Sequence, residues 1–182
     1  RKAPGTDSFE VVANTQKLFN RIHMAMRVSE DGSGNIWLAG HGLCRYNVAT
    51  RTFDRLVDSF PYIKMPDKQV TTMVADRGDN LWIACYNNGL VRYNLKEKTF
   101  RHFTRDDGLP DNNIASLFIV GNKLWVAGFS GIACLDLSTC SITSFGKEDG
   151  FPDMPIAQGT NFFYDSLQNR LYLALSNTVV RF

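Results

Sequence analysis

Residues that could carry out acid–base or nucleophilic chemistry are few in this 182-residue sequence, and they are scattered along it. The three histidines are His23, His41 and His102, and the sequence has no G-x-S-x-G, H-E-x-x-H or phosphate-binding-loop motif. We interpret His102 as an exposed strand residue and place only His41 at a candidate site. No residue is assigned a catalytic role.

Two acidic pairs, Asp106-Asp107 and Glu148-Asp149, suggest acid–base catalysis by two carboxylates. Both pairs recur in the same connector, 42 residues apart, whereas a catalytic pair need occur only once. Turn formation and solvation therefore explain these acids better than catalysis does.

Metal chemistry is also weakly supported. Asp76, Asp79 and Asn80 offer oxygen ligands suited to Ca²⁺, but their loop is short and lacks a bidentate glutamate. Cys44, Cys85, Cys134 and Cys140 show no CxxC spacing and no histidine at zinc-ligand distance. They are either four buried free thiols or include a Cys134–Cys140 bridge. We expect no metal and no cofactor.

Internal repetition is the strongest signal in the sequence. One motif, an apolar run around an aromatic residue, occurs four times, spaced 45, 43 and 47 residues apart. Its aromatic residues, which include all three tryptophans of the chain, are Trp37, Trp82, Trp125 and Tyr172. Since every unit carries the ring at the same place, we expect these side chains to pack between neighbouring sheets. Stacking on carbohydrate is the alternative interpretation.

Each unit is predicted to form four short strands. An apolar run such as 70–75 or 114–120 is followed by a turn rich in Gly, Asn and Asp, then by the aromatic strand and two further strands. No window has sustained helical periodicity. Four strands per roughly 45 residues are typical of a β-propeller blade. The predicted fold is all-β, with about four blades of four-stranded antiparallel sheet that belong to a larger propeller.

The repeats also set the expected boundaries. Residues 1–21 are the end of a preceding blade or a closing strand, and three blades and a partial one follow at 22–68, 69–110, 111–153 and 154–182. The sequence starts without an initiator Met or an apolar signal core and stops within an apparent strand. We therefore expect a piece of a longer protein.

Composition excludes several classes of partner. The chain is 44% hydrophobic and 21% charged, as in ordinary globular proteins, and its net charge of +2 is too small to predict nucleic-acid binding. The longest apolar run, 114–120, is far shorter than a membrane span. No direct membrane contact is expected. Exposed blade faces would be sticky, which favours self-association, for example as a homodimer.

Several motifs resemble the two-component regulator propeller repeat. They are the turn and strand at 30–37 and 79–83, the Gly-Leu-x-Arg-Tyr-Asn strands at 42–47 and 89–94, and the connector at 107–112. The resemblance implies the periplasmic sensor region of a Bacteroides-type hybrid two-component system, an inner-membrane protein with a histidine kinase. It further implies that the region binds a small ligand, an oligosaccharide, without catalysis of its own.

The expected ligand face is formed by loops at one end of the blades, since their residues vary while the strands repeat. Amides and aromatic rings suit sugar hydroxyls and apolar sugar faces. The candidate residues are His41, Tyr86, Asn87, Asn88, Phe129, Ser130, Asp111 and Asn112, with Asn113 beside them. Alternatives are simple turn formation by these residues, a propeller enzyme such as a streptogramin-lyase-like lyase, or a protein–protein scaffold.

Overall fold

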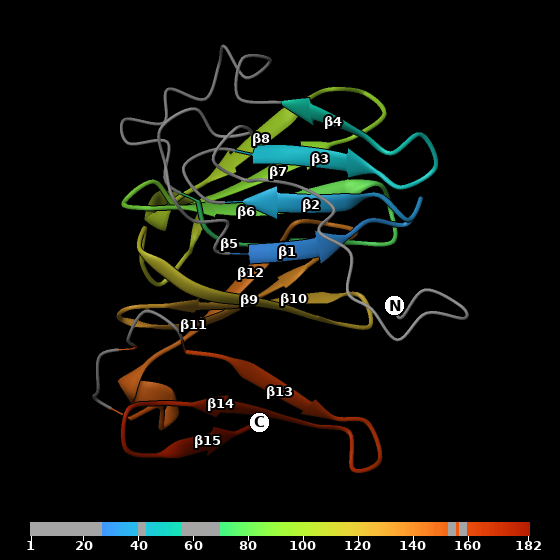
Figure 1. Ribbon diagram of the computed structural model, residues 1–182. Coiled ribbons are helices and arrows are strands. Elements are labelled where there is room, and N and C mark those ends of the chain that lie inside the picture. Colours follow the sequence, from blue (N-terminus) through green and yellow to red (C-terminus); the bar gives the residue numbers. More distant parts are fainter. Residues whose placement is uncertain (1–26, 40–42, 56–69, 153–155, 157–159) are drawn as a thin grey trace.

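The computed structural model describes residues 27–39, 43–55, 70–152, 156 and 160–182, which form four antiparallel sheets. Within each sheet, every strand pairs with the next one in the chain (Figure 1). The strands of the first two sheets are β1 (Arg27–Glu30), β2 (Ile36–Ala39), β3 (Leu43–Asn47), β4 (Thr52–Arg55), β5 (Val70–Ala75), β6 (Asn80–Cys85), β7 (Leu90–Asn94) and β8 (Phe100–Phe103). The strands of the other two are β9 (Ile114–Val120), β10 (Lys123–Gly128), β11 (Gly131–Asp136), β12 (Ile142–Phe145), β13 (Phe162–Asp165), β14 (Arg170–Ala174) and β15 (Val179–Arg181). The predicted all-β blade architecture is confirmed.

The sheets follow one another in chain order, from the blue and cyan strands β1–β4 to the red strands β13–β15 (Figure 1). Strand β1 contacts β5, β5 contacts β9 and β9 contacts β13, so the first strands of neighbouring sheets lie beside one another. The expected segment 1–21 lies outside the described residues. None of the helical segments in the described ranges is long and apolar enough to cross a membrane.

Apolar clusters fill the spaces between neighbouring sheets, and alternation along β6 shows why each strand is apolar on both faces. Leu81 and Ile83 pack in the cluster shared with the first sheet, and Trp82 and Ala84 in the cluster shared with the third. Successive side chains of a strand point to opposite faces, so a strand between two sheets needs both sets. This explains an unbroken apolar run where a half-exposed strand would alternate.

The tryptophan of each of the first three units points toward the following sheet. Trp37 is 1% exposed in the cluster with the second sheet, and Trp82 is fully buried against the third. Trp125 is only half-buried, although it packs on the cluster shared with the fourth sheet and lies near the ring of Phe145. Tyr172 is half-buried on the face of the fourth sheet that points away from the third.

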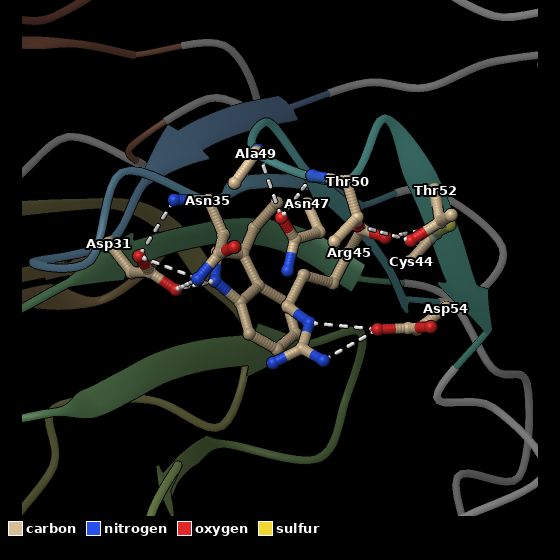
Figure 2. Close-up of polar contacts among 10 residues, drawn as sticks. Asp31, Asn35, Cys44, Arg45, Asn47, Ala49, Thr50, Thr52 and Asp54 are labelled. Carbon is tan, nitrogen blue, oxygen red and sulfur yellow. Dashed lines mark hydrogen bonds and ion pairs between the residues drawn. The ribbon is translucent and has the colours of Figure 1, made fainter.

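An aspartate fixes each of the two most buried indoles. The carboxylate of Asp31 accepts a hydrogen bond from Trp37 Nε1 at 2.8 Å, and Asp76 accepts one from Trp82 Nε1 at the same distance. Both carboxylates also accept N–H groups of their own hairpin turn, as Figure 2 shows for Asp31 and Asn35. The turn and the core residue are thereby held by one carboxylate, which satisfies an indole N–H that burial would otherwise leave unpaired.

The last turn of each complete sheet is also built alike. The side-chain oxygen of Asn47, Asn94 or Asp136 accepts the backbone N–H groups two and three residues later (Figure 2 shows Asn47). Such local bonds favour a turn over continued strand. This is why the third and fourth strands form tight hairpins.

The connectors differ from the strand-only expectation. Short 3₁₀ helices, η2 (Arg105–Asp107) and η3 (Lys147–Asp149), follow the second and third sheets. In each, a carboxylate accepts the N–H of the residue before the helix: Asp107 bonds Thr104 at 2.8 Å and Asp149 bonds Gly146 at 2.9 Å. A helix of one turn has no periodicity to detect in the sequence, so only the turn character was predictable.

All four cysteines are buried thiols that form no disulfide, so of the two alternatives the structure has the buried thiols and not the Cys134–Cys140 bridge. Burial raises the pKa of the Cys85 thiol to about 12, which keeps it protonated and unreactive at neutral pH.

Candidate functional site

The candidate face is formed where three segments meet at one end of the second and third sheets. These segments are the loop between β6 and β7, the loop between β10 and β11, and the connector from β8 to β9. The loops are short because tight pairing continues up to them: Ala84 pairs with Leu90, and Gly128 with Gly131. Strand pairing therefore fixes the base of each loop.

Asn113 joins the two loops. Its side-chain oxygen accepts the backbone N–H of Asn87 at 3.0 Å, and its carbonyl oxygen accepts the N–H of Phe129 at 3.0 Å. Its own N–H donates to Asp111 Oδ1 at 2.8 Å. One residue of the connector thus links loops that belong to two different sheets.

The neighbouring connector residues add two more links. Asp111 Oδ2 accepts a hydrogen bond from Ser130 Oγ at 2.5 Å, and the carbonyl of Asn112 accepts the N–H of Gly89 at 2.8 Å. The side-chain oxygen of Asn112 accepts the N–H of Arg105, which ties the face to η2. Five of the predicted site residues, Asn87, Asp111, Asn112, Phe129 and Ser130, therefore share one hydrogen-bonded network with Asn113.

Glycine is required at the base of the β6–β7 loop. Gly89 has a φ of +71°, and a Cβ there would lie 2.3 Å from the carbonyl oxygen of Phe103. Gly131 occupies the same place in the third sheet, where a Cβ would lie 2.9 Å from the carbonyl oxygen of Phe145. The outer strand therefore approaches each loop more closely than any side chain allows.

His102 contributes to this face, which sequence analysis missed. Its Nε2 forms a short hydrogen bond with the carbonyl of Asn88, so the outer strand β8 supports the β6–β7 loop. The interpretation of His102 as an exposed strand residue is correct for its exposure and its strand. The one signal for this contact is strand order: His102 lies on β8, and β8 pairs with β7, the strand that directly follows the β6–β7 loop.

Exposure separates surface groups from supporting groups. Tyr86 is 40% exposed, and Asn87 and Ser130 are also exposed. Asn88, Asp111, Asn112 and Phe129 are half-buried. His41 lies outside the described residues. The face thus presents an aromatic ring, an amide and a hydroxyl above a layer of supporting amides.

One acid of each acidic pair, Asp107 or Asp149, has a structural partner. Hydrogen bonds from the backbone and then the side chain of Thr104 lower the pKa of Asp107. Asp106 and Glu148 are exposed on the same one-turn helices. Two carboxylates that stabilise equivalent turns need no catalytic role.

The oxygen ligands weighed for Ca²⁺ in the sequence analysis are also engaged in other bonds. The carboxylate of Asp76 accepts N–H groups from Gly78, Asn80 and Trp82, and Asp79 pairs with Lys96 at 2.5 Å. Within the described ranges, no group of three or more His, Cys, Asp or Glu side chains is arranged to bind a metal ion.

These sheets, each packed on the next through an apolar cluster, have the architecture of β-propeller blades. The chain superposes with a TM-score of 0.58 and 12% identity on the β-propeller domain of Cps50 (Swd1) from Myceliophteria thermophila, covering 85% of this chain and 50% of that one. No protein-family model matches the sequence, and comparison with curated proteins finds no match.

Two other similar structures are extracellular domains from B. thetaiotaomicron, of proteins assigned as the hybrid two-component systems BT4673 and BT3049. The first has a TM-score of 0.64 and 20% identity. The alignment covers 86% of this chain and 20% of that domain. The second has a TM-score of 0.61 and 20% identity, with coverage of 85% and 24%. The chain thus spans about a fifth to a quarter of the length of these structures, and the similarity shows a shared fold.

Proposed function

We propose that this chain supplies blades of a periplasmic sensor propeller in a hybrid two-component system, and that it helps to bind an oligosaccharide. The observation that carries the proposal is the face on which one hydrogen-bonded network holds loops of two sheets and presents Tyr86, Asn87 and Ser130. The resemblance of the repeats and the similarity to two extracellular domains of two-component systems support the sensor assignment.

The chemistry of the face suits a sugar. An exposed tyrosine ring can stack on the apolar side of a pyranose, and amide and hydroxyl groups can exchange hydrogen bonds with sugar hydroxyls. These groups stand on loops fixed by strand pairing, which is the usual placement of recognition residues on a rigid scaffold. Further blades complete the ring, and downstream domains and a membrane helix relay binding to the kinase. No catalysis is assigned to these blades.

Calorimetric titration of the 182-residue chain with a panel of oligosaccharides tests the proposal. We expect one sugar class to bind, and Tyr86→Ala to weaken that binding roughly tenfold, as loss of an aromatic anchor does. Leu167→Ala is the matched control, because Leu167 is 96% exposed on a turn at the opposite end of the fourth sheet. Binding that is unaffected by Tyr86→Ala would place the sugar elsewhere, and absence of heat with every sugar would refute a sugar-binding face.

A further inference from the structure

A cavity of about 540 Å³ lies at the end of the sheets opposite the candidate face. The turn between β5 and β6 forms one wall, and the turns between β9 and β10 and between β11 and β12 form the other. Its volume is within the range of small-molecule sites. The cavity is made entirely by the second and third sheets and is separate from the proposed oligosaccharide face.

The cavity exists because the third sheet departs from the repeat. Residues 76–79 join β5 to β6, but only residues 121–122 join β9 to β10. Ile119, near the end of β9, packs toward the second sheet. The third sheet therefore lacks the longer turn that the second sheet has at this end, and the space beside the β5–β6 turn stays open.

The lining combines an apolar floor with a polar rim. Ala75, Ile119 and Leu137 supply the apolar part. Arg77, Asn122 and Ser138 supply side chains that can hydrogen-bond a ligand.

The lining carries one carboxylate, that of Asp76, and one cation, Arg77. The Arg77 side chain is exposed and makes no hydrogen bond or ion pair with any residue that the structure describes. Asp76 is buried, and its carboxylate accepts N–H groups from Trp82 and Asn80. The nearby Asp136 is outside the lining and accepts the N–H groups of Ser138 and its neighbour.

Comparison of the two sheets shows a second change of charge. The carbonyls of Asp79 and Asn122 accept equivalent N–H groups, so these residues occupy corresponding positions. In the second sheet Asp79 forms an ion pair with Lys96 at 2.5 Å. In the third sheet the corresponding pair is neutral: Asn122 Nδ2 donates to Ser138 Oγ at 2.9 Å, and it also donates to Asp136 Oδ2 at 3.4 Å. The carboxylates beside the cavity, Asp76 and Asp136, are both held by N–H donors, and neither pairs with Arg77.

We propose that this cavity binds a small carboxylate with a short aliphatic body. The guanidinium of Arg77 binds the carboxylate, because a planar pair of N–H donors matches two carboxylate oxygens. Asn122 and Ser138 add hydrogen bonds at the rim. The aliphatic body lies over Ala75, Ile119 and Leu137, where its burial is favourable.

Calorimetric titration of the 182-residue chain with hexanoate, and with hexanamide as its neutral analogue, tests the charge requirement. We expect hexanoate to bind and hexanamide to bind at least roughly tenfold more weakly, because a hydrogen bond to a charged group is lost. Arg77→Gln should weaken hexanoate binding by a similar factor. Arg170→Gln is the matched control, since Arg170 is an exposed arginine beside the corresponding turn of the fourth sheet.

A second variant and a second ligand sharpen the result. Asn122→Asp places a carboxylate at the rim and should also weaken hexanoate binding, while circular dichroism reports whether the variants remain folded. Equal binding of hexanoate and hexanamide, unchanged affinity in Arg77→Gln, or no heat with hexanoate would overturn the proposal. Binding of glucuronate in preference to hexanoate would overturn the aliphatic part of it.

Discussion

At the scale of single residues, the carboxylate–indole pair decides how firmly each sheet is attached to the next. Trp82 is fully buried and bonded to Asp76, whereas Trp125 is half-buried and has Val120 at the position that corresponds to Asp76. The two tryptophans therefore make different contributions to stability, although the sequence motif around them is the same.

Replacing Trp82 by Ala should lower the free energy of unfolding by about 3–5 kcal/mol, because it leaves a large cavity and removes one hydrogen bond from the Asp76 carboxylate. Trp125→Ala should cost less, since part of its ring already contacts water. Urea unfolding followed by circular dichroism measures both values. An equal loss in the two variants would contradict the unequal burial.

Asp31 should make the free energy of unfolding depend on pH. Burial by itself would raise the pKa of Asp31, but hydrogen bonds from Trp37 and Asn35 lower this pKa below its ordinary value of 3.8. The unfolded chain therefore binds the proton more readily than the folded one. The stabilisation is present above the unfolded pKa and is lost as pH falls through the lower pKa of the folded state.

Comparison of the native chain with Asp31→Asn tests this dependence. The difference in urea midpoint between them should be largest above the unfolded pKa, roughly 4, and should shrink as the pH falls through the lower pKa of the folded state. A difference that does not change with pH would show that the Asp31 charge contributes nothing to folding.

At the scale of elements, the close approach between the β6–β7 loop and the outer strand β8 requires glycine at position 89. Gly89→Ala should destabilise the chain by more than about 1 kcal/mol, because the left-handed φ and the contact with the Phe103 carbonyl both exclude a side chain. Gly32→Ala is the control, since a Cβ at Gly32 would have no atom within 4 Å. Thermal unfolding should separate the two variants; similar melting temperatures would contradict the close approach.

The connector helix η2 carries two neighbouring acids, Asp106 and Asp107, of which one can serve as the control for the other. Asp107→Ala should lower the melting temperature more than Asp106→Ala, because only the Asp107 carboxylate accepts hydrogen bonds from Thr104. Differential scanning calorimetry measures both. If Asp106→Ala were the more damaging substitution, the structural account of these acids would be wrong.

Local patterns in the sequence were enough to predict the strands. The runs 70–75 and 114–120 form β5 and β9 as expected, because turn residues mark their ends and apolar residues fill both faces. The bonds made by Asn113 and His102 could not be predicted, since they join loops and strands that are distant in the chain. The cavity was missed for a similar reason: it depends on a length difference between two hairpins in neighbouring sheets. The role of Tyr86 and its neighbours in binding stays a prediction, and His41 lies outside the described residues.

At the scale of the whole molecule, the outer face of the fourth sheet is apolar and open. Phe163 is 66% exposed and Val179 is 64% exposed, and Phe163 pairs across the sheet with Tyr172. Comparable positions on the earlier sheets are covered by the next sheet in the chain. Apolar patches of this kind promote association.

The 182-residue chain should therefore self-associate as its concentration rises. Sedimentation velocity should show a larger average mass at higher concentration, and Phe163→Ser should reduce the effect. Val48→Ser, which changes an apolar residue that is 50% exposed on a turn, should not. A monomer at every concentration would refute this prediction.

The two hydrogen bonds that Asn113 accepts from Asn87 and Phe129 have a consequence for affinity. A ligand that binds flexible loops must first order them, and the entropy lost in doing so reduces the net binding free energy. Here the connector already holds Asn87 and Phe129 in one arrangement before any ligand arrives. The face is preorganised, so contacts that are individually weak can contribute most of their energy to recognition.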